Sequence, residues 1–307
     1  MNNDSIEIKG VYTAVVTPFT HDGKVDEEGF IANLHYQMEN GADGLVVLGT
    51  TGEAPTLTHG EKKQLIQLAV REVHGRIPVM IGTGSYSTAT AIENTLEAQR
   101  LGADAALVVT PYYNKPTQEG LYRHFKAIAE AVEFPIMVYN IAGRTGQNMT
   151  TETLKRLGAI RNIVGVKEAS GSIVQMMEVM EAIGNVNPNF SLMCGDDMLT
   201  LPCMSIGGRG IISVVSNLVP RPIKNMVECI ERKEYEEAKA IHYELVPLFR
   251  AAFLETNPIA IKAAMDMCGM AAGPCRLPLC ELSSENNAKL IKVLVESIPS
   301  TMLTTSV

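Results

Sequence analysis

The sequence predicts an α/β protein, a (β/α)8 barrel (TIM barrel) with a helical appendage at its C-terminal end. Eight short apolar runs rich in β-branched residues recur up to residue 215, and segments with helical patterning separate them. Strands that alternate with helices pair in parallel. Eight such units in about 220 residues fit a closed barrel. After about residue 221 the strand-like runs stop while helical patterning continues.

The expected elements follow from composition and hydrophobic period. The strands are expected at residues 11–17, 44–49, 78–82, 105–110, 135–140, 163–167, 190–195 and 210–215. The helices between them include Glu27–Glu39, Glu61–His74, Thr88–Arg100, Gln118–Ala131 and Ser172–Ile183. An open, doubly wound sheet is the alternative. The Gly-x-Gly at residues 82–84 argues against it, because the acidic partner of a dinucleotide-binding fingerprint is missing downstream.

The C-terminal part reads as helices only, at Ile223–Lys233, Tyr235–Phe253, Pro258–Met267 and Ser284–Ser297. We therefore expect a catalytic barrel over residues 1–221 and a helical domain over residues 222–307, which includes the last helix of the barrel. The apolar residues of this part are core candidates first and partner contacts second.

Composition limits the kind of function. The net charge of -8 argues against a nucleic-acid partner. The longest apolar runs are shorter than a membrane span needs, and the start of the chain lacks a signal-peptide core, so we expect a cytoplasmic protein. The six cysteines include no Cys-x-x-Cys pair, which favours reduced thiols, and no Cys/His spacing suggests zinc. We expect neither a metal nor a cofactor.

Lys167 is the unusual residue of the sixth strand, Ile163-Val164-Gly165-Val166-Lys167-Glu168. Lysine is seldom buried in such an apolar, β-branched run. A structural interpretation is a lysine that reaches out of the sheet edge or pairs with Glu168. A chemical interpretation is an amine placed in an apolar site, where it can form a Schiff base with a ketone.

Polar and glycine-rich segments follow most of the predicted strands. They are Gly49–Glu53, Thr110–Pro116, Tyr139–Gly146, Lys167 itself and Gly195–Asp197, with Gly207–Gly210 just before the last strand. Each has a structural interpretation, such as a helix cap, packing at the rim or a surface cation. In a barrel the carboxyl ends of all strands meet at one face, where the chemistry is found. Their coincidence at that face favours an active site.

The residue types at these ends suit one reaction class. Lys167 must be neutral to attack a ketone, so burial has to lower its pKa. The hydroxyls of Tyr139, Thr51 and Tyr113 form a candidate proton relay. The Thr50-Thr51 turn offers backbone N–H groups and hydroxyls to a carboxylate, and Arg144 offers a second, bidentate site. These residues therefore predict a site that holds a keto acid on a lysine and binds a second anionic substrate beside it.

From Gly10 to about Pro299 the chain resembles the dihydrodipicolinate synthase family, within the pyruvate-dependent class I aldolases that include N-acetylneuraminate lyase. Four motifs have the order and spacing of the family: Gly49–Glu53, Thr110–Pro116, Tyr139–Gly146 and Gly165–Ala169. The resemblance implies condensation of pyruvate with L-aspartate 4-semialdehyde to 4-hydroxy-tetrahydrodipicolinate. This is the first committed step of diaminopimelate and lysine biosynthesis.

The resemblance also implies catalytic roles. Lys167 would form the Schiff base with pyruvate, and Tyr139 would donate and accept protons. Thr50, or in some accounts Thr51, would link Tyr139 to Tyr113 in the relay. In the family this second tyrosine reaches into a neighbouring subunit's site, which implies a homodimer, usually paired into a tetramer.

The substrate-binding residues implied by the resemblance are Thr51 and the backbone of Ile212 for pyruvate and Arg144 for the carboxylate of the aldehyde. Gly195 is placed in the same group. Sialic acid lyases generally lack an arginine at the position of Arg144, which favours the synthase. An N-acetylneuraminate lyase or a keto-sugar-acid aldolase remains an alternative, since the same fold can host sites of different substrate specificity. A catalytically silent keto-acid-binding regulator is the non-enzyme alternative.

Two departures from the family have consequences. Ala142 stands where the family often has proline, so the loop of Arg144 is expected to be less rigid. Lys62, Tyr86 and Thr90 stand where lysine-inhibited relatives tend to have His, Asn and Glu, although Tyr112 is retained. A cation at Lys62 would repel the ammonium of lysine, so feedback inhibition by lysine is expected to be weak or absent.

Overall fold

The computed structural model describes residues 6–184 and 186–303. Its eight strands are hydrogen-bonded in chain order as a closed barrel, which confirms the predicted (β/α)8 fold class. The strands are β1 (Gly10–Ala14), β2 (Gly44–Val47), β3 (Val79–Gly82), β4 (Ala105–Val109), β5 (Ile136–Asn140), β6 (Ile163–Glu168), β7 (Ser191–Cys194) and β8 (Gly210–Ser213). Contacts divide the chain into two compact units. Among the described residues, the first joins residues 6–10 to those of Pro78–Ile212, and the second joins Val11–Ile77 to residues 213–303.

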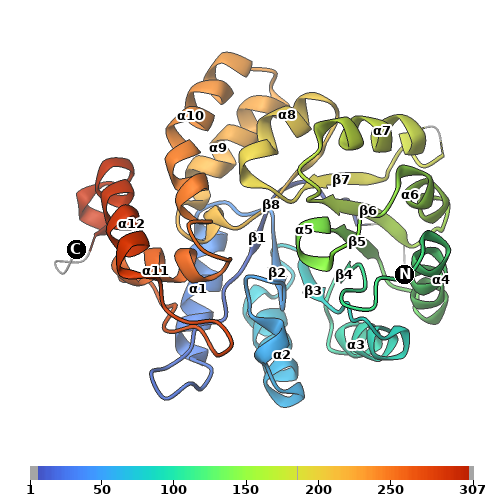
Figure 1. Cartoon of the computed structure of the whole chain (residues 1–307), viewed down its shortest axis with the longest axis horizontal. Helices are drawn as coiled ribbons and strands as arrows, with labels where there is room; N and C mark the ends of the chain where they lie inside the picture. Colours follow the sequence, from blue (N-terminus) through green and yellow to red (C-terminus); the bar gives the residue numbers. More distant parts are fainter. Residues whose placement is uncertain (1–5, 185, 304–307) are drawn as a thin grey trace. The chain divides into compact units, whose positions relative to one another are not determined.

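The first unit contains the parallel strands β3 to β7 and most of β8. Its helices are α3 (Thr88–Arg100), α4 (Gln118–Ala131), α5 (Ala142–Thr145), α6 (Thr151–Gly158), α7 (Ile173–Gly184), η2 (Asp197–Leu199) and α8 (Thr200–Ser205). Helices α3, α4, α6 and α7 follow one another along the strands, each packed on the next (Figure 1). Side-chain oxygens of Ser87, Thr117 and Thr150 accept a backbone hydrogen bond at the start of α3, α4 and α6. These caps fix where the helices begin.

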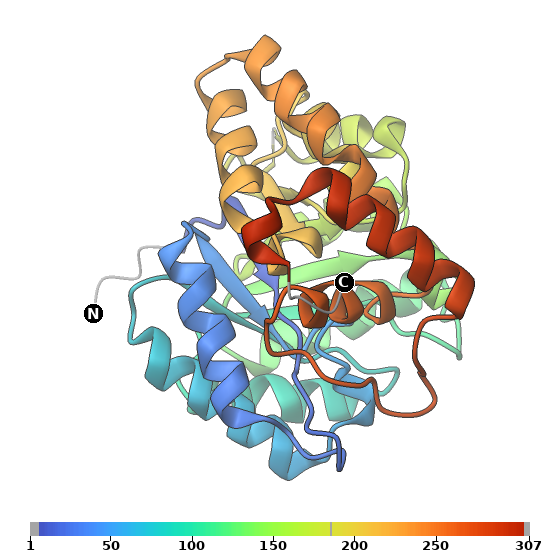
Figure 2. The same ribbon diagram turned by 90° about the vertical axis from the view of Figure 1, so that its left-hand side faces the viewer.

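The second unit contains most of β1, all of β2, and helices from the N-terminal and C-terminal parts of the chain. They are α1 (Glu27–Glu39), η1 (Ala54–Thr56), α2 (His59–Val73), η3 (Val215–Asn217), α9 (Pro220–Glu231), α10 (Tyr235–Ala251), α11 (Ile259–Met267), α12 (Ser284–Ser297) and η4 (Ser300–Met302). Helix α10 packs against both α9 and α12 (Figure 2). Gly44 of β2 lies against the buried ring of Tyr12, where a Cβ would come within 2.2 Å of a ring carbon. Only glycine fits there.

The predicted strands are all present. Strands β1, β2, β4, β7 and β8 end one to three residues before the predicted runs do, β3 and β5 end where predicted, and β6 runs one residue further. The run 44–49 stops at Val47 because Leu48 adopts a left-handed backbone, with φ 59°. The run 210–215 stops at Ser213 because the chain turns into η3. Helix α2 begins at His59, two residues before the predicted start, because Thr58 and Glu61 form a capping box. The short helices α6 and α8 were not singled out by hydrophobic period.

All six cysteines are free thiols. Within residues 6–184 and 186–303, no helix combines the length and the apolar character that crossing a membrane requires. In the same part of the chain, no three His, Cys, Asp or Glu side chains are grouped so that they could hold a metal ion.

Candidate active site

Lys167 lies near the carboxyl end of β6 and is only 6% exposed. Successive residues of a strand face opposite sides, so Lys167 and Glu168 point apart. The carboxylate of Glu168 accepts hydrogen bonds from Asn140 Nδ2 at 3.0 Å, Gln175 Nε2 at 3.1 Å and the backbone N–H of Ser170 at 2.7 Å. The sequence allowed an ion pair between Lys167 and Glu168. The carboxylate of Glu168 instead forms hydrogen bonds with these three residues.

Tyr139 is the neighbour of Lys167 on the adjacent strand. The two residues are register partners between β5 and β6, and partners in a parallel pair point to the same face. The ammonium nitrogen of Lys167 lies 4.4 Å from the centre of the Tyr139 ring, and Tyr139 is 6% exposed. The predicted nucleophile and the predicted proton-transfer residue are thus in contact, buried together.

The pKa of Lys167 is lowered from its ordinary 10.5 to about 8. Burial is the largest cause, because an ammonium loses its hydration in an apolar site. The positive charge of Arg144 lowers the pKa further, whereas Asp197 and Cys194 act in the opposite direction. An amine with this pKa is neutral in a useful fraction of molecules near neutral pH, which is what nucleophilic attack on a ketone needs.

This pKa predicts how adduct formation depends on pH. With a pKa of about 8, roughly one tenth of the amine is neutral at pH 7. The second-order rate of pyruvate trapping should therefore rise close to tenfold per unit below pH 8 and level above it, measured by quenched borohydride reduction. In Asp197→Asn the midpoint should move to lower pH, because a charge that raises the pKa is removed. A midpoint that stays above pH 10 would contradict the prediction.

Gly195 gives Lys167 its space. A Cβ at this position would lie 3.1 Å from Lys167 Cε and 2.7 Å from the Cβ of Ala169. The backbone N–H of Gly195 donates to the carbonyl of Glu168 at 2.8 Å, which ties β7 to β6 beside the lysine. A side chain at position 195 would therefore crowd the predicted nucleophile.

The two aspartates after β7 have different roles. Asp196 caps η2, because its side chain accepts from the backbone N–H of Met198 at 3.0 Å. Asp197 is 1% exposed, and its charge acts on Lys167. Sequence reasoning considered both as helix caps and missed the second role. The sequence Gly195-Asp196-Asp197 contains an indication of this second role. A helix cap needs only one carboxylate, so the other aspartate is available for another function.

Arg144 lies in α5, directly after β5, and is exposed. The segment is a closed helical turn, since the backbone N–H of Gly146 donates to the carbonyl of Ala142 at 2.9 Å. Gly146 ends the turn with a left-handed φ of 74°. Ala142 therefore begins a hydrogen-bonded turn. The guanidinium of Arg144 is near enough to Lys167 to influence its pKa.

Tyr113 stands apart from this cluster. It is 91% exposed in the single chain and has a left-handed backbone, with φ 71°. Such a backbone is uncommon for an aromatic residue and costs free energy. The preceding Tyr112 packs edge-to-face on Tyr86, with 5.4 Å between ring centres, and Asn114 donates to the carbonyl of Tyr86 at 3.0 Å. These contacts fix the loop and leave the ring of Tyr113 projecting into solvent.

The remaining predicted residues belong to two strands, β8 and β2. Ile212 is fully buried on β8, in the unit that contains Lys167. Thr50 and Thr51 belong to the second unit and follow β2. They form a turn in which the backbone N–H of Glu53 donates to the carbonyl of Thr50 at 3.1 Å. Thr51 is 2% exposed, and its hydroxyl accepts a hydrogen bond from Asn257 Nδ2 at 3.0 Å.

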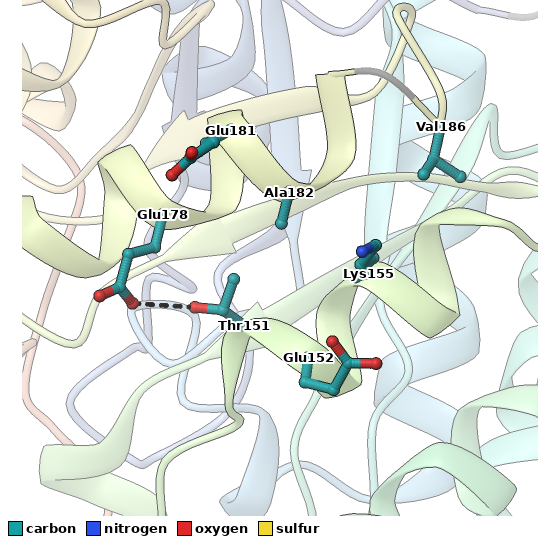
Figure 3. A pocket seen from close by; sticks show the side chains of 7 residues that line it. All are labelled: Thr151, Glu152, Lys155, Glu178, Glu181, Ala182 and Val186. Atoms are coloured by element: carbon teal, nitrogen blue, oxygen red, sulfur yellow. Dashed lines mark hydrogen bonds between the residues drawn. The ribbon is translucent and has the colours of Figure 1, made fainter.

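A separate hollow of about 640 Å³ lies between α6 and α7 (Figure 3). Its lining includes three carboxylates, and the hydroxyl of Thr151 donates to Glu178 at 3.2 Å. The lining residues are Thr151, Glu152, Lys155, Glu178, Glu181, Ala182 and Val186. None of the predicted site residues is among them, and the excess of negative charge disfavours a keto acid there.

Comparisons with known proteins agree on one family. Residues 7–297 match the dihydrodipicolinate synthetase family. The 4-hydroxy-tetrahydrodipicolinate synthase of Protochlamydia amoebophila (strain UWE25) is 55% identical over 289 residues, which cover 94% of this chain and 96% of that relative. The enzyme of the same name from Syntrophotalea carbinolica is 47% identical and covers 93% and 96%. A crystal structure of dihydrodipicolinate synthase from Aquifex aeolicus is similar with a TM-score of 0.93 and 42% identity, covering 97% of this chain and all of that one.

Proposed function

Because this chain belongs to the dihydrodipicolinate synthetase family, we propose that it condenses pyruvate with L-aspartate 4-semialdehyde on Lys167. The activity is that of a 4-hydroxy-tetrahydrodipicolinate synthase, a lyase of diaminopimelate and lysine biosynthesis. The observation that supports Lys167 as the residue is its buried amine, with a pKa of about 8, in contact with Tyr139. The Schiff base forms on the amine of Lys167 itself, so we assign no cofactor.

The proposed steps use groups of this chain. The neutral amine of Lys167 attacks the ketone carbon of pyruvate, and loss of water leaves an imine. Tyr139, within reach of the amine, passes protons to the departing oxygen and from the methyl carbon, which forms the enamine. The enamine carbon attacks the aldehyde of the second substrate. The amine of that substrate then adds to the imine carbon, releases Lys167 and closes the ring.

Substrate positioning is assigned to groups around this amine. Thr51 and the backbone of Ile212 hold the pyruvate carboxylate, and Gly195 leaves room for the imine beside Lys167. Thr50 or Thr51 passes protons between Tyr139 and Tyr113. We assign this chemistry to a catalytic barrel over residues 1–221, with residues 222–307 as the helical domain.

Arg144 is proposed to bind the carboxylate of the aldehyde substrate. Replacing it with alanine should raise KM for L-aspartate 4-semialdehyde by roughly 10- to 100-fold, the range expected when a charged hydrogen bond worth about 1.5–3 kcal/mol is lost. The KM for pyruvate should change by less than about threefold, because only the second carboxylate loses its partner. Initial rates against each substrate measure the split. Equal effects on both substrates would indicate a structural role instead.

Tyr113 supports an oligomer. An aromatic ring that is 91% exposed on a left-handed backbone is better explained if a second subunit covers it. We propose a homodimer in which Tyr113 completes the neighbour's site, paired into a tetramer as a dimer of dimers, in the cytoplasm. Neither a nucleic acid nor a membrane is assigned as a partner.

Weak or absent inhibition by lysine remains our expectation, because the cation of Lys62 would repel the ammonium of lysine.

One assay decides between the proposed activity and its alternatives. Turnover of pyruvate with L-aspartate 4-semialdehyde is coupled to the NAD(P)H-dependent reductase that consumes the product, and N-acetylneuraminate cleavage is measured beside it. Activity in the first assay alone is the expected result. Activity only in the second assay would support the Schiff-base role of Lys167 and contradict the proposed role of Arg144 in binding the aldehyde substrate. Borohydride trapping of pyruvate without turnover of any aldehyde would indicate a keto-acid-binding regulator.

A further inference from the structure

The turn that holds Thr50 and Thr51 is bounded by two strained residues. Leu48 and Glu53 both have left-handed backbones, with φ of 59° and 50°, and neither is glycine. Such conformations persist only where the surrounding structure fixes them, and they concentrate at functional sites. The contacts that fix this turn come from a segment more than 200 residues later in the chain.

Asn257 contacts Thr51 directly. Its Nδ2 donates to Thr51 Oγ1 at 3.0 Å, and the two residues are 5% and 2% exposed. A hydroxyl has one proton and can accept as well as donate. Because the amide of Asn257 occupies an acceptor position of Thr51, the proton of Thr51 is directed toward another group. The contact therefore sets both the position and the donor direction of this hydroxyl.

Glu53 anchors the other end of the turn. Its carboxylate accepts from Lys262 Nζ at 2.7 Å and from the backbone N–H of Arg276 at 2.9 Å. Lys262 also donates to the carbonyls of Thr17 and Pro274, at 3.1 and 2.8 Å. The side chains of Glu53 and Lys262 are 0% and 2% exposed, so this ion pair is sealed from solvent. Such a pair holds its geometry tightly, since every alternative leaves a buried charge unpaired.

We propose that Asn257 is a positioning residue for Thr51 and that residues 257–276, through Asn257 and the Glu53–Lys262 pair, support the pyruvate-binding turn. This inference rests on the proposed role of Thr51 in holding pyruvate. It makes the helical part after the last strand a contributor to catalysis. Asn257 acts through the hydroxyl of Thr51 and touches no substrate.

A double-mutant cycle tests the coupling. Asn257→Ala should lower kcat/KM for pyruvate by about tenfold, the scale of one hydrogen bond to a buried hydroxyl. In a Thr51→Val background, which has no hydroxyl to direct, the same substitution should change kcat/KM by less than about twofold. In a Thr51→Ser background, which keeps the hydroxyl, the tenfold effect should return. The rate of borohydride-trapped pyruvate adduct is measured for every variant, so slow turnover does not limit the cycle.

Asn33→Ala is the matched control. Asn33 is 4% exposed, and its Nδ2 donates to the carbonyl of Ala271 at 2.7 Å, so it holds the same segment without touching Thr51. Its effect on kcat/KM should be the same in all three backgrounds. Asn257→Asp provides a second variant of equal volume that presents an acceptor to Thr51 in place of a donor. It should lower kcat/KM at least as much as Asn257→Ala, with thermal unfolding reporting that the fold is kept.

The outcomes separate two failures. Equal effects of Asn257→Ala in the Thr51→Val and Thr51→Ser backgrounds would overturn the positioning role, because a structural effect is independent of the hydroxyl. Wild-type activity of Asn257→Asp would overturn it as well. If the wild-type chain traps no pyruvate at all, the proposed function itself fails. Trapping in the wild type with additive effects in the cycle removes only the inference about Asn257.

Discussion

Lys167→Ala should abolish borohydride trapping of pyruvate and lower turnover by several orders of magnitude. The amine of Lys167 is the group proposed to bond with the ketone, so the substitution removes the nitrogen of the imine. Intact-protein mass spectrometry after reduction with pyruvate detects the adduct. Lys155→Ala is the control, since Lys155 is exposed in the hollow between α6 and α7 and should leave the adduct intact. An adduct that persists in Lys167→Ala would remove the central assignment.

Lys262→Met should lower the free energy of unfolding by about 3–5 kcal/mol, the range for breaking a buried ion pair by removing one partner. Glu53 is fully buried and would lose the ammonium that lies 2.7 Å from its carboxylate. Urea denaturation followed by circular dichroism measures the loss. The size of the effect follows from burial, because the pair is held at 2.7 Å with side chains 2% and 0% exposed.

Two further variants test the explanation for Lys262. Lys289→Met removes an exposed partner of Glu285, 53% and 81% exposed, and should cost less than about 1 kcal/mol. Adding Glu53→Gln to Lys262→Met should recover part of the lost stability, because the unpaired charge is gone. A loss below about 1 kcal/mol for Lys262→Met alone would show that the buried pair contributes little.

Most of the architecture was predictable from local pattern. β-branched runs gave the eight strands, and α1, α3, α4 and α12 have the predicted bounds, because hydrophobic period and caps coincide there. Lys167 stood out because an apolar strand seldom contains lysine. The helical part was predicted from the end of strand-like runs, and the structure agrees.

The contacts that complete the site depend on distant partners and could not be predicted. Lys262 appears in the sequence as one cation on a helix, and its partner Glu53 lies 209 residues earlier. Asp196 and Asp197 are adjacent and chemically identical, and only the turn into η2 gives one to a cap and the other to Lys167. Asn257 was part of a loop before a helix, with nothing local to connect it to Thr51.

The alternation of β6 has a consequence for the fidelity of folding. Lys167 and Glu168 are neighbours of opposite charge type, and a slip of the strand by one residue would exchange the faces that the lysine and the glutamate occupy. Such a slipped chain would still bury an apolar run, so hydrophobicity alone discriminates weakly against it. Asn140, Gln175 and Ser170 donate hydrogen bonds to the carboxylate of Glu168, and these bonds form only in the native register of β6. The carboxylate of Glu168 thereby fixes the face of the strand to which Lys167 points.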